Sequence, residues 1–464
     1  PTIRQVLERA EQLGLSEPRI AFLLRQRSLI DEMQQLNMLM RGMLTGLLDA
    51  QAAEREAVRS MLIAILAYQR DGQISDAKIN ELTQLADRFP RMVQLQIAMA
   101  VLLNDRGAFA DAATRLERLT RSHPQLLMAQ EMLVQARARA GQFAAALTTA
   151  NSLRETLVRM GQSTQAIDTT VAELLMSLKR PQEAVNILQP HAESPDAPSQ
   201  VLTTYANALM TSGRYDQARR VLEPHLSQVS AIRIAWLSLA AEHLPDAVTL
   251  RRWIADVQAF LEPNDVERLN LANAWQRCAV RFNDDEALQQ AIALLDELVS
   301  VESPLAAALL LRGAVADYQQ KFDEAERWYR AAIEKDERSA VTMNNLAMVL
   351  SRRADALDEA LQFAERAVAL APNQLEFMDS LATIHQKRND HEAALATWNR
   401  IAQMDPDNPR WLLAQAKAYR DLNQIAEARR LLNQAEARIA TGGNTALRDQ
   451  ARELRLELDQ LPQP

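Results

Sequence analysis

The chain repeats a pattern of small and large apolar positions with a period of about 34 residues. The clearest marker is an alanine, and most neighbouring copies of it lie about one such period apart. The marker alanines are Ala112, Ala146, Ala184, Ala218, Ala291, Ala325, Ala360, Ala394 and Ala428. The gap between Ala218 and Ala291 is about twice the period and would hold two repeats, and Ala77 lies one period before Ala112. We therefore expect about eleven repeats of one helical type between positions 58 and 442.

Each marker alanine has similar surroundings. A glycine lies five residues before it in several repeats, and an aromatic residue lies three before it. Small residues recur twelve positions before it, at Ala100, Ala172, Ala206, Gly313, Ala382 and Ala416. This spacing predicts two amphipathic helices per repeat, joined by a short turn. The small positions should be where helix backbones cross most closely, because a larger side chain there would force the two helices apart.

A helix-turn-helix repeat of this length and pattern resembles the tetratricopeptide repeat (TPR) family, whose motif runs W-x2-L-G-x2-Y, then A-x3-F, then A and P. The resemblance covers about four fifths of the chain and is best in the last four repeats. One of these contains Leu346, Ala347, Leu350, Ala360, Ala364, Ala367 and Pro372, and the next contains Leu381, Ala382, Ala394, Trp398 and Pro406. The resemblance implies an all-α fold, a right-handed superhelical solenoid of stacked helix-turn-helix TPR units with terminal capping helices.

The pattern divides the chain into five parts. Residues 1–57 form an N-terminal helical segment, which could start in the middle of a repeat, because residues 3–18 read like a second helix with its closing proline. A fragment or processed chain and an ordinary capping helix both fit this segment. Residues 58–232 and 272–442 hold TPR units. Residues 233–271 lose the small-residue pattern and predict a degenerate, distorted helix pair, and 443–464 predict a C-terminal capping helix and tail.

Composition supports an all-helical protein. Of the 464 residues, 48% are hydrophobic and only 11 are glycine, and alternating β-branched runs are almost absent. The net charge of −8 gives no general attraction to nucleic acid or to an anionic membrane. No apolar run reaches the ~20 residues that direct membrane insertion requires. The chain has 46 arginines and 6 lysines, a bias typical of GC-rich bacterial genomes. We favour a cytoplasmic location, and a periplasmic one remains open if an N-terminal signal was removed.

Motifs for catalysis are missing from the sequence. It contains no glycine-rich phosphate loop and no H-E-x-x-H, C-x-x-C or G-x-S-x-G motif. The six histidines are dispersed, and His191 and His225 occupy the same position of successive repeats. The single cysteine, Cys278, lies on an apolar helical face, where a buried inert thiol is expected. We predict a protein that is not an enzyme, with no catalytic residue, no cofactor and no metal site.

The TPR resemblance implies that the first helices of the repeats line a concave groove that receives an extended or helical peptide. With each marker alanine numbered 20, positions 2, 5, 9 and 12 should face this groove. The candidate ligand-binding residues are Glu173, Met176, Gln200, Thr203, Asn207, Met210, Asn344, Met348, Asp379, Thr383, Arg410, Lys417 and Arg420. The predicted groove is polar but mostly uncharged, with methionines, and turns acidic and then basic at its C-terminal end. Alternatively, these side chains are merely solvated and partners use other faces.

Two functional classes remain. The first is a non-catalytic protein–protein interaction scaffold that binds a protein or peptide along the groove. The second is the TPR portion of a larger bacterial protein or complex with an attached enzyme or a polysaccharide-export function. The family's carboxylate clamp is not predicted, because only Asn345 matches a clamp position. The sequence leaves the identity of the partner and the oligomeric state open.

Overall fold

The computed structural model describes residues 57, 60, 61, 63 and 64, and then residues 74–261, 264–442 and 445–461. All regular secondary structure in this part of the chain is helical. Contacts between residues divide the chain into two compact bodies, an N-terminal body (Pro1–Glu223) and a C-terminal body (Pro224–Pro464). The expected N-terminal helical segment lies almost entirely outside the described residues. The all-α prediction is confirmed.

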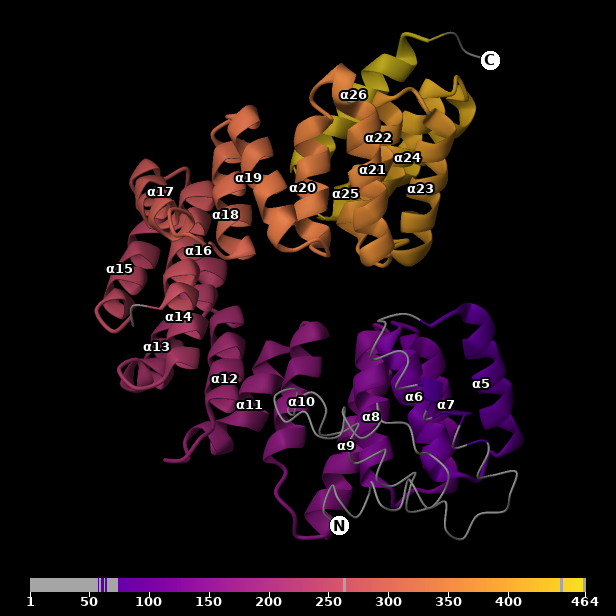
Figure 1. Ribbon diagram of the computed structural model, residues 1–464, viewed down its shortest axis with the longest axis vertical. Helices are drawn as coiled ribbons and strands as arrows, with labels where there is room; N and C mark the ends of the chain where they lie inside the picture. Colours follow the sequence, from indigo (N-terminus) through magenta and orange to yellow (C-terminus); the bar gives the residue numbers. More distant parts are fainter. Residues whose placement is uncertain are drawn as a thin grey trace. The chain divides into compact units, whose positions relative to one another are not determined.

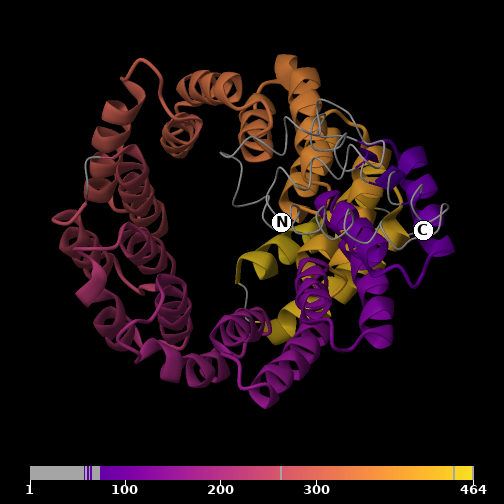
Figure 2. The same ribbon diagram turned by 60° about the horizontal axis from the view of Figure 1, so that its bottom comes forward.

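The N-terminal body contains α5 (Asp76–Arg88), α6 (Val93–Asp105), α7 (Phe109–Ser122), α8 (Leu127–Arg139), α9 (Phe143–Arg159), α10 (Gln165–Ser177), α11 (Pro181–Ala192), α12 (Ser199–Thr211) and α13 (Tyr215–Leu222). A short 3-10 helix, η2 (Glu223–His225), follows α13. Each helix packs against the next along the chain (Figures 1 and 2). In the described part of this body, α5 is followed by four helix pairs, namely α6 with α7, α8 with α9, α10 with α11 and α12 with α13.

The C-terminal body contains α14 (Ser230–His243), α15 (Ala247–Gln258), α16 (Asp265–Phe282), α17 (Asp285–Val299), α18 (Ala306–Tyr318), α19 (Phe322–Lys335), α20 (Ala340–Leu350), η3 (Ala354–Ala356), α21 (Leu357–Leu370), α22 (Leu375–Lys387), α23 (His391–Met404), α24 (Pro409–Asp421), α25 (Ile425–Gly442) and α26 (Thr445–Asp459). The same pairing continues from α14 with α15 to α24 with α25. Helix α26 packs against α24 and α25 through Ala451, Leu454 and Leu458.

The marker alanines lie where the pattern places them. All nine, from Ala112 to Ala428, have no solvent-exposed surface. A close helix crossing is directly visible at Gly313, since a Cβ atom added there would lie 2.7 Å from the Tyr329 ring. Ala77 differs, because it is exposed in the first turn of α5, which buries Ile79, Leu82 and Ala86 instead. Ala77 therefore does not occupy the buried crossing position that the other marker alanines share.

In seven repeats the turn between the two helices has a left-handed residue five positions before the marker alanine. Glycine fills this position at Gly107, Gly141 and Gly213, where φ lies between 74° and 77°. Other repeats place non-glycine residues in the same conformation, namely Lys179, Gln320, Asn389 and Asn423, with φ between 57° and 63°. The backbone of the turn is thus the same in repeats whose sequences differ. This explains why the glycine signal alone cannot locate every repeat.

The stretch expected to be degenerate, 233–271, contains two ordinary helices and the start of a third. Helix α14 packs more extensively against α16 than against its own partner α15. Two tryptophans join α14 to α15. The ring centres of Trp236 and Trp253 lie 4.6 Å apart, and Trp236 Nε1 donates to the Trp253 carbonyl at 2.7 Å. A buried ion pair between Arg233 and Glu267 joins α14 to α16. The pair α14–α15 is therefore packed differently from its neighbours.

Candidate functional site

The first helices of successive repeats form the more closely packed layer. In the N-terminal body α10 contacts α12, and in the C-terminal body α16, α18, α20 and α22 contact one another in turn (Figure 1). Among the described helices, successive second helices do not pack together to this extent. We call the solvent-facing side of these helices the first-helix stripe, and it is the surface on which the sequence places the candidate residues.

In the N-terminal body the stripe crosses α10 and α12. Glu173 and Gln200 are exposed, and their side chains are hydrogen-bonded to each other across the two helices. Partial burial raises the pKa of the Glu173 carboxyl, and the Gln200 hydrogen bond opposes this shift. Thr203 and Asn207 follow along α12 and are half-buried. These four residues thus form one continuous polar surface.

The methionines of the N-terminal stripe separate into two kinds. Met176 is half-buried and lies at the edge of the stripe. Met210 is only 1% exposed, because α12 turns this side chain into the core beside Leu209 and Ala206. The expectation that Met210 faces a ligand is therefore wrong. The spacing rule fails at this position because the last turn of α12 is covered by neighbouring apolar residues.

In the C-terminal body the neutral candidates lie on α20 and α22. Asn344, Met348 and Thr383 are half-buried. The Oδ1 atom of Asn344 is buried and has no hydrogen-bond donor among the described residues. An unsatisfied buried acceptor costs ~1–3 kcal/mol. Asn344 therefore carries a buried acceptor that no described group satisfies.

The charged candidates Asp379 and Arg410 neutralise each other. Asp379 on α22 accepts a hydrogen bond from Trp398 Nε1 at 2.9 Å and forms an ion pair with Arg410 on α24. The Arg410 guanidinium also lies 4.8 Å from the centre of the Trp411 ring. The predicted acidic and basic residues thus form an ion pair with each other. This pairing reduces the charge that the surface presents to a ligand.

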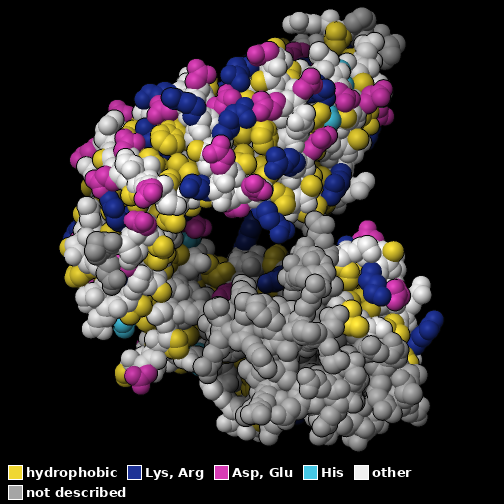
Figure 3. Space-filling model, viewed as in Figure 1, with side chains coloured by type: hydrophobic (Ala, Val, Ile, Leu, Met, Phe, Trp, Pro, Cys, Tyr) yellow, Lys and Arg dark blue, Asp and Glu magenta, His cyan; other side chains and the backbone are white. Residues whose placement is uncertain are grey.

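Arg420 is paired in the same way. Its guanidinium donates to Asp421 at 2.6 and 2.9 Å and forms an ion pair with Glu457 of α26. Lys417, one turn earlier on α24, is half-buried and has no ion pair among the described residues. Of the three basic candidates, only Lys417 presents a charge that no described carboxylate neutralises. On the face of the C-terminal body that Figure 3 shows, basic and acidic side chains are likewise interspersed.

A ladder of polar contacts links the C-terminal ends of successive first helices, and none of its members is among the candidate residues. Arg352 pairs with Asp317 at 3.6 Å, Lys387 donates to the Ser351 carbonyl and hydroxyl at 3.0 Å each, and Gln386 donates to Asp421 at 2.5 Å. Burial, followed by the nearby charge of Arg352, lowers the pKa of Lys387. The signal was present, because Arg352, Lys387 and Asp421 recur about one repeat apart.

Other polar residues singled out by the sequence have structural partners. Asn345, which matches a clamp position, is hydrogen-bonded to the buried hydroxyl of Tyr329. His191 bonds through Nε2 to Asp168 at 2.8 Å, and Arg154 also pairs with this carboxylate, which is 1% exposed. Among the described residues, no group of histidine, cysteine and acidic side chains could hold a metal ion. No helix in the described ranges is long and apolar enough to cross a membrane.

We predict that Cys278 resists alkylation while the chain is folded. The side chain has no exposed surface, and burial raises the pKa of its thiol to about 11, with Asp284 adding to the shift. The reactive thiolate is thus ~1000-fold scarcer than the thiol at pH 8. Iodoacetamide labelling followed by mass spectrometry should show modification only after unfolding in urea. Rapid labelling of the folded chain at pH 8 would contradict a buried thiol.

Comparison with known proteins supports the repeat assignment. Family models described as tetratricopeptide repeat match residues 199–224, 339–371 and 380–444. These segments cover α12 with α13, α20 with α21, and most of α22 to α25. A search of curated proteins finds no significant match.

Similar solved structures include YrrB, described as a TPR protein with an unusual peptide-binding site. It is 19% identical over 45% of this chain and 99% of its own (TM-score 0.33). MamA is 15% identical over 38% of this chain and 95% of its own (TM-score 0.33). A tetratricopeptide repeat protein from Parabacteroides merdae is 15% identical over 56% of this chain and 98% of its own (TM-score 0.37). At these scores the likeness carries no functional information.

The helix pairs, their buried alanines and the three matched segments agree in register. Every marker alanine from Ala112 to Ala428 is buried in the second helix of its pair, both inside and outside the three matched segments. The repeats that no family model matches therefore follow the same pattern as those that are matched. The chain therefore belongs to the tetratricopeptide repeat family.

Proposed function

We propose that this protein is a non-catalytic interaction scaffold that binds an extended segment of a partner protein along the first-helix stripe. The observation that carries the proposal is that the stripe is accessible while most of its charges are already paired. Asp379 is paired with Arg410, and Arg420 is paired with Asp421 and Glu457. The groups left for a ligand are mainly neutral hydrogen-bonding and thioether side chains.

Such a surface suits recognition of the main chain of a peptide. Amide and hydroxyl groups can donate to and accept from peptide groups without selecting a particular charge, and flexible thioethers adapt to varied side chains. Thr203 and Asn207 on α12, beside Glu173 on α10, supply the polar groups in the N-terminal body. Asn344 and Thr383, together with Met348, supply the same chemistry in the C-terminal body.

The proposal predicts that peptides selected by the whole chain from a displayed random library depend on Glu173 and Asn207. The double variant Glu173→Ala, Asn207→Ala should weaken binding by about tenfold or more, because it removes hydrogen-bonding groups from adjacent helices. The Kd would be measured by isothermal titration calorimetry. Binding should weaken by less than about threefold between low and physiological ionic strength, since few unpaired charges take part.

The matched control is the double variant Glu183→Ala, Asn186→Ala, which removes the same residue types from the exposed face of α11, a second helix of the same body. It should leave the Kd unchanged. Equal losses in the two double variants would argue against the stripe. Retained binding in the first variant, combined with release in an Arg410→Ala, Lys417→Ala, Arg420→Ala triple variant, would move the site to the basic end. Selection of no peptides would argue against the function itself.

A further inference from the structure

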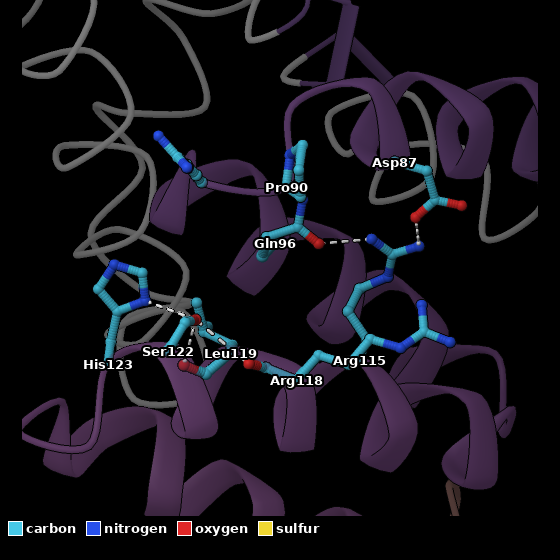
Figure 4. A pocket seen from close by; sticks show the side chains of 9 residues that line it. Asp87, Pro90, Gln96, Arg115, Arg118, Leu119, Ser122 and His123 are labelled. Atoms are coloured by element: carbon cyan, nitrogen blue, oxygen red, sulfur yellow. Dashed lines mark hydrogen bonds and ion pairs between the residues drawn. The ribbon is translucent and has the colours of Figure 1, made fainter.

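The strongest unassigned feature is a basic pocket of about 410 Å³ in the N-terminal body, away from the first-helix stripe. Its walls come from the end of α5, the turn before α6, α6 itself and the C-terminal half of α7 (Figure 4). The polar and charged residues that line it are Asp87, Arg91, Gln96, Arg115, Arg118, Ser122 and His123. Three arginines against one aspartate make the pocket positive, although the whole chain has a net charge of −8.

One arginine is held rigidly at the pocket wall. Gln96 is 6% exposed, and its Nε2 donates to the carbonyls of Ala86 and Phe89 at 2.7 and 3.1 Å. Its Oε1 is therefore fixed and accepts from Arg115 at 2.5 Å, while Asp87 accepts from the same guanidinium at 2.8 Å. Figure 4 shows Arg115 pointing across the pocket to both partners. The Arg115 side chain is only 10% exposed, so its charge is weakly screened by water.

The other two arginines of the lining lack a carboxylate partner in the described part of the chain. Asp87 already pairs with Arg115, and neither Arg91 nor Arg118 has an ion pair with any described residue. The C-terminal end of α7 favours cations, and this explains why an arginine stands at position 118. It does not account for Arg91, which lies in the turn before α6. His123, whose Nδ1 lies 2.9 Å from Ser122 Oγ, adds a hydrogen-bonding group at the opposite end from Arg115.

We propose that this pocket binds an oxyanion carried by a partner protein, either the carboxylates of an acidic segment or a phosphorylated side chain. Three guanidinium groups line the pocket. That of Arg115 is fixed, and those of Arg91 and Arg118 have no carboxylate partner among the described residues. Arginine recognises carboxylate and phosphate oxygens through such groups. The lining contains no phenylalanine, tyrosine or tryptophan on which a nucleobase could stack, and the chain is acidic overall. A protein ligand therefore fits better than a nucleic acid.

The test uses the full chain and fluorescein-labelled peptides, read by fluorescence anisotropy. The probes are a peptide of six glutamates, the same peptide with a central phosphoserine, and a peptide of six glutamines. The glutamate peptide should bind at low salt, the glutamine peptide should not, and affinity should fall as salt is added. Tighter binding of the phosphoserine peptide would identify phosphate as the preferred oxyanion, and equal binding would identify the carboxylate.

The decisive comparison is between two double variants with equal charge changes. Arg91→Glu, Arg118→Glu reverses the two pocket charges that lack described partners and should weaken binding by about tenfold or more. Arg88→Glu, Arg121→Glu reverses two exposed arginines of α5 and α7 outside the lining and should weaken it by less than about threefold. Both variants should keep the circular dichroism spectrum of the parent. Equal losses, retained binding in the pocket variant, or no binding of the glutamate peptide would each overturn the proposal.

Discussion

Replacing Glu267 with alanine should lower the free energy of unfolding by about 3–5 kcal/mol, the largest effect that we expect from a single side chain. Glu267 and Arg233 are 0% and 1% exposed. Arg233 donates to the Glu267 carboxylate from both Nε and Nη2, at 2.6 to 3.1 Å, and Nη1 donates to the Leu226 carbonyl at 3.0 Å. Without Glu267 the buried guanidinium would lose the carboxylate that accepts these hydrogen bonds.

The measurement is urea unfolding followed by circular dichroism. Glu297→Ala provides the control, because Glu297 pairs with Arg268 at the surface with 65% of its side chain exposed, and such pairs contribute ~0–1 kcal/mol. The double variant Arg233→Met, Glu267→Leu should be much closer to the parent than Glu267→Ala, because it removes both charges together. A loss below about 1 kcal/mol in Glu267→Ala would show that water reaches the pair.

The buried ion pair between Arg233 and Glu267 could not be predicted from the sequence. Arg233 and Glu267 are one repeat period apart, and they lie at the two ends of the stretch that had lost the small-residue pattern. The pattern set this stretch apart from the other repeats. It could not indicate the buried charges within that stretch, because a charged residue in a sequence reads as solvated until its partner and its burial are known.

The fold was predictable because its signal is repeated. A single alanine has little meaning, but nine copies in register define the crossing point of two helices, and all nine are buried. The alanine signal is misleading at the N-terminal end of the repeats. Ala77 has the right spacing but lies in the first turn of α5, where it is exposed. The handedness of the superhelix and the five-part division of the chain stay predictions.

The candidate site was only partly predictable. Glu173 and Gln200 are exposed and Thr383 is half-buried, whereas Met210 is in the core. The sequence also suggested a charged C-terminal end, but Asp379 and Arg410 neutralise each other across one repeat step. Periodicity assigns a residue to a helix face. It does not show which neighbouring helix supplies a partner, because that depends on distances between helices.

The crossing positions provide the second large expected effect, since Ala394→Trp should lower the free energy of unfolding by about 1–3 kcal/mol or more. Ala394 lies in α23 with no exposed surface, in one cluster with Met378 and Ala382 of α22. An indole side chain cannot fit there unless the two helices move apart, and each repeat contacts mainly its neighbours. Ala218→Trp, at the equivalent position of α13, should behave in the same way.

The control for this prediction is Ala396→Trp, two residues further along α23, where the side chain is exposed. It introduces the same residue into the same helix and should change the free energy of unfolding by less than about 0.5 kcal/mol. Thermal and urea unfolding of the three variants and the parent would be compared. If Ala394→Trp and Ala396→Trp had equal stability, the alanine would not mark the helix crossing, and the register on which every other assignment depends would have to be shifted.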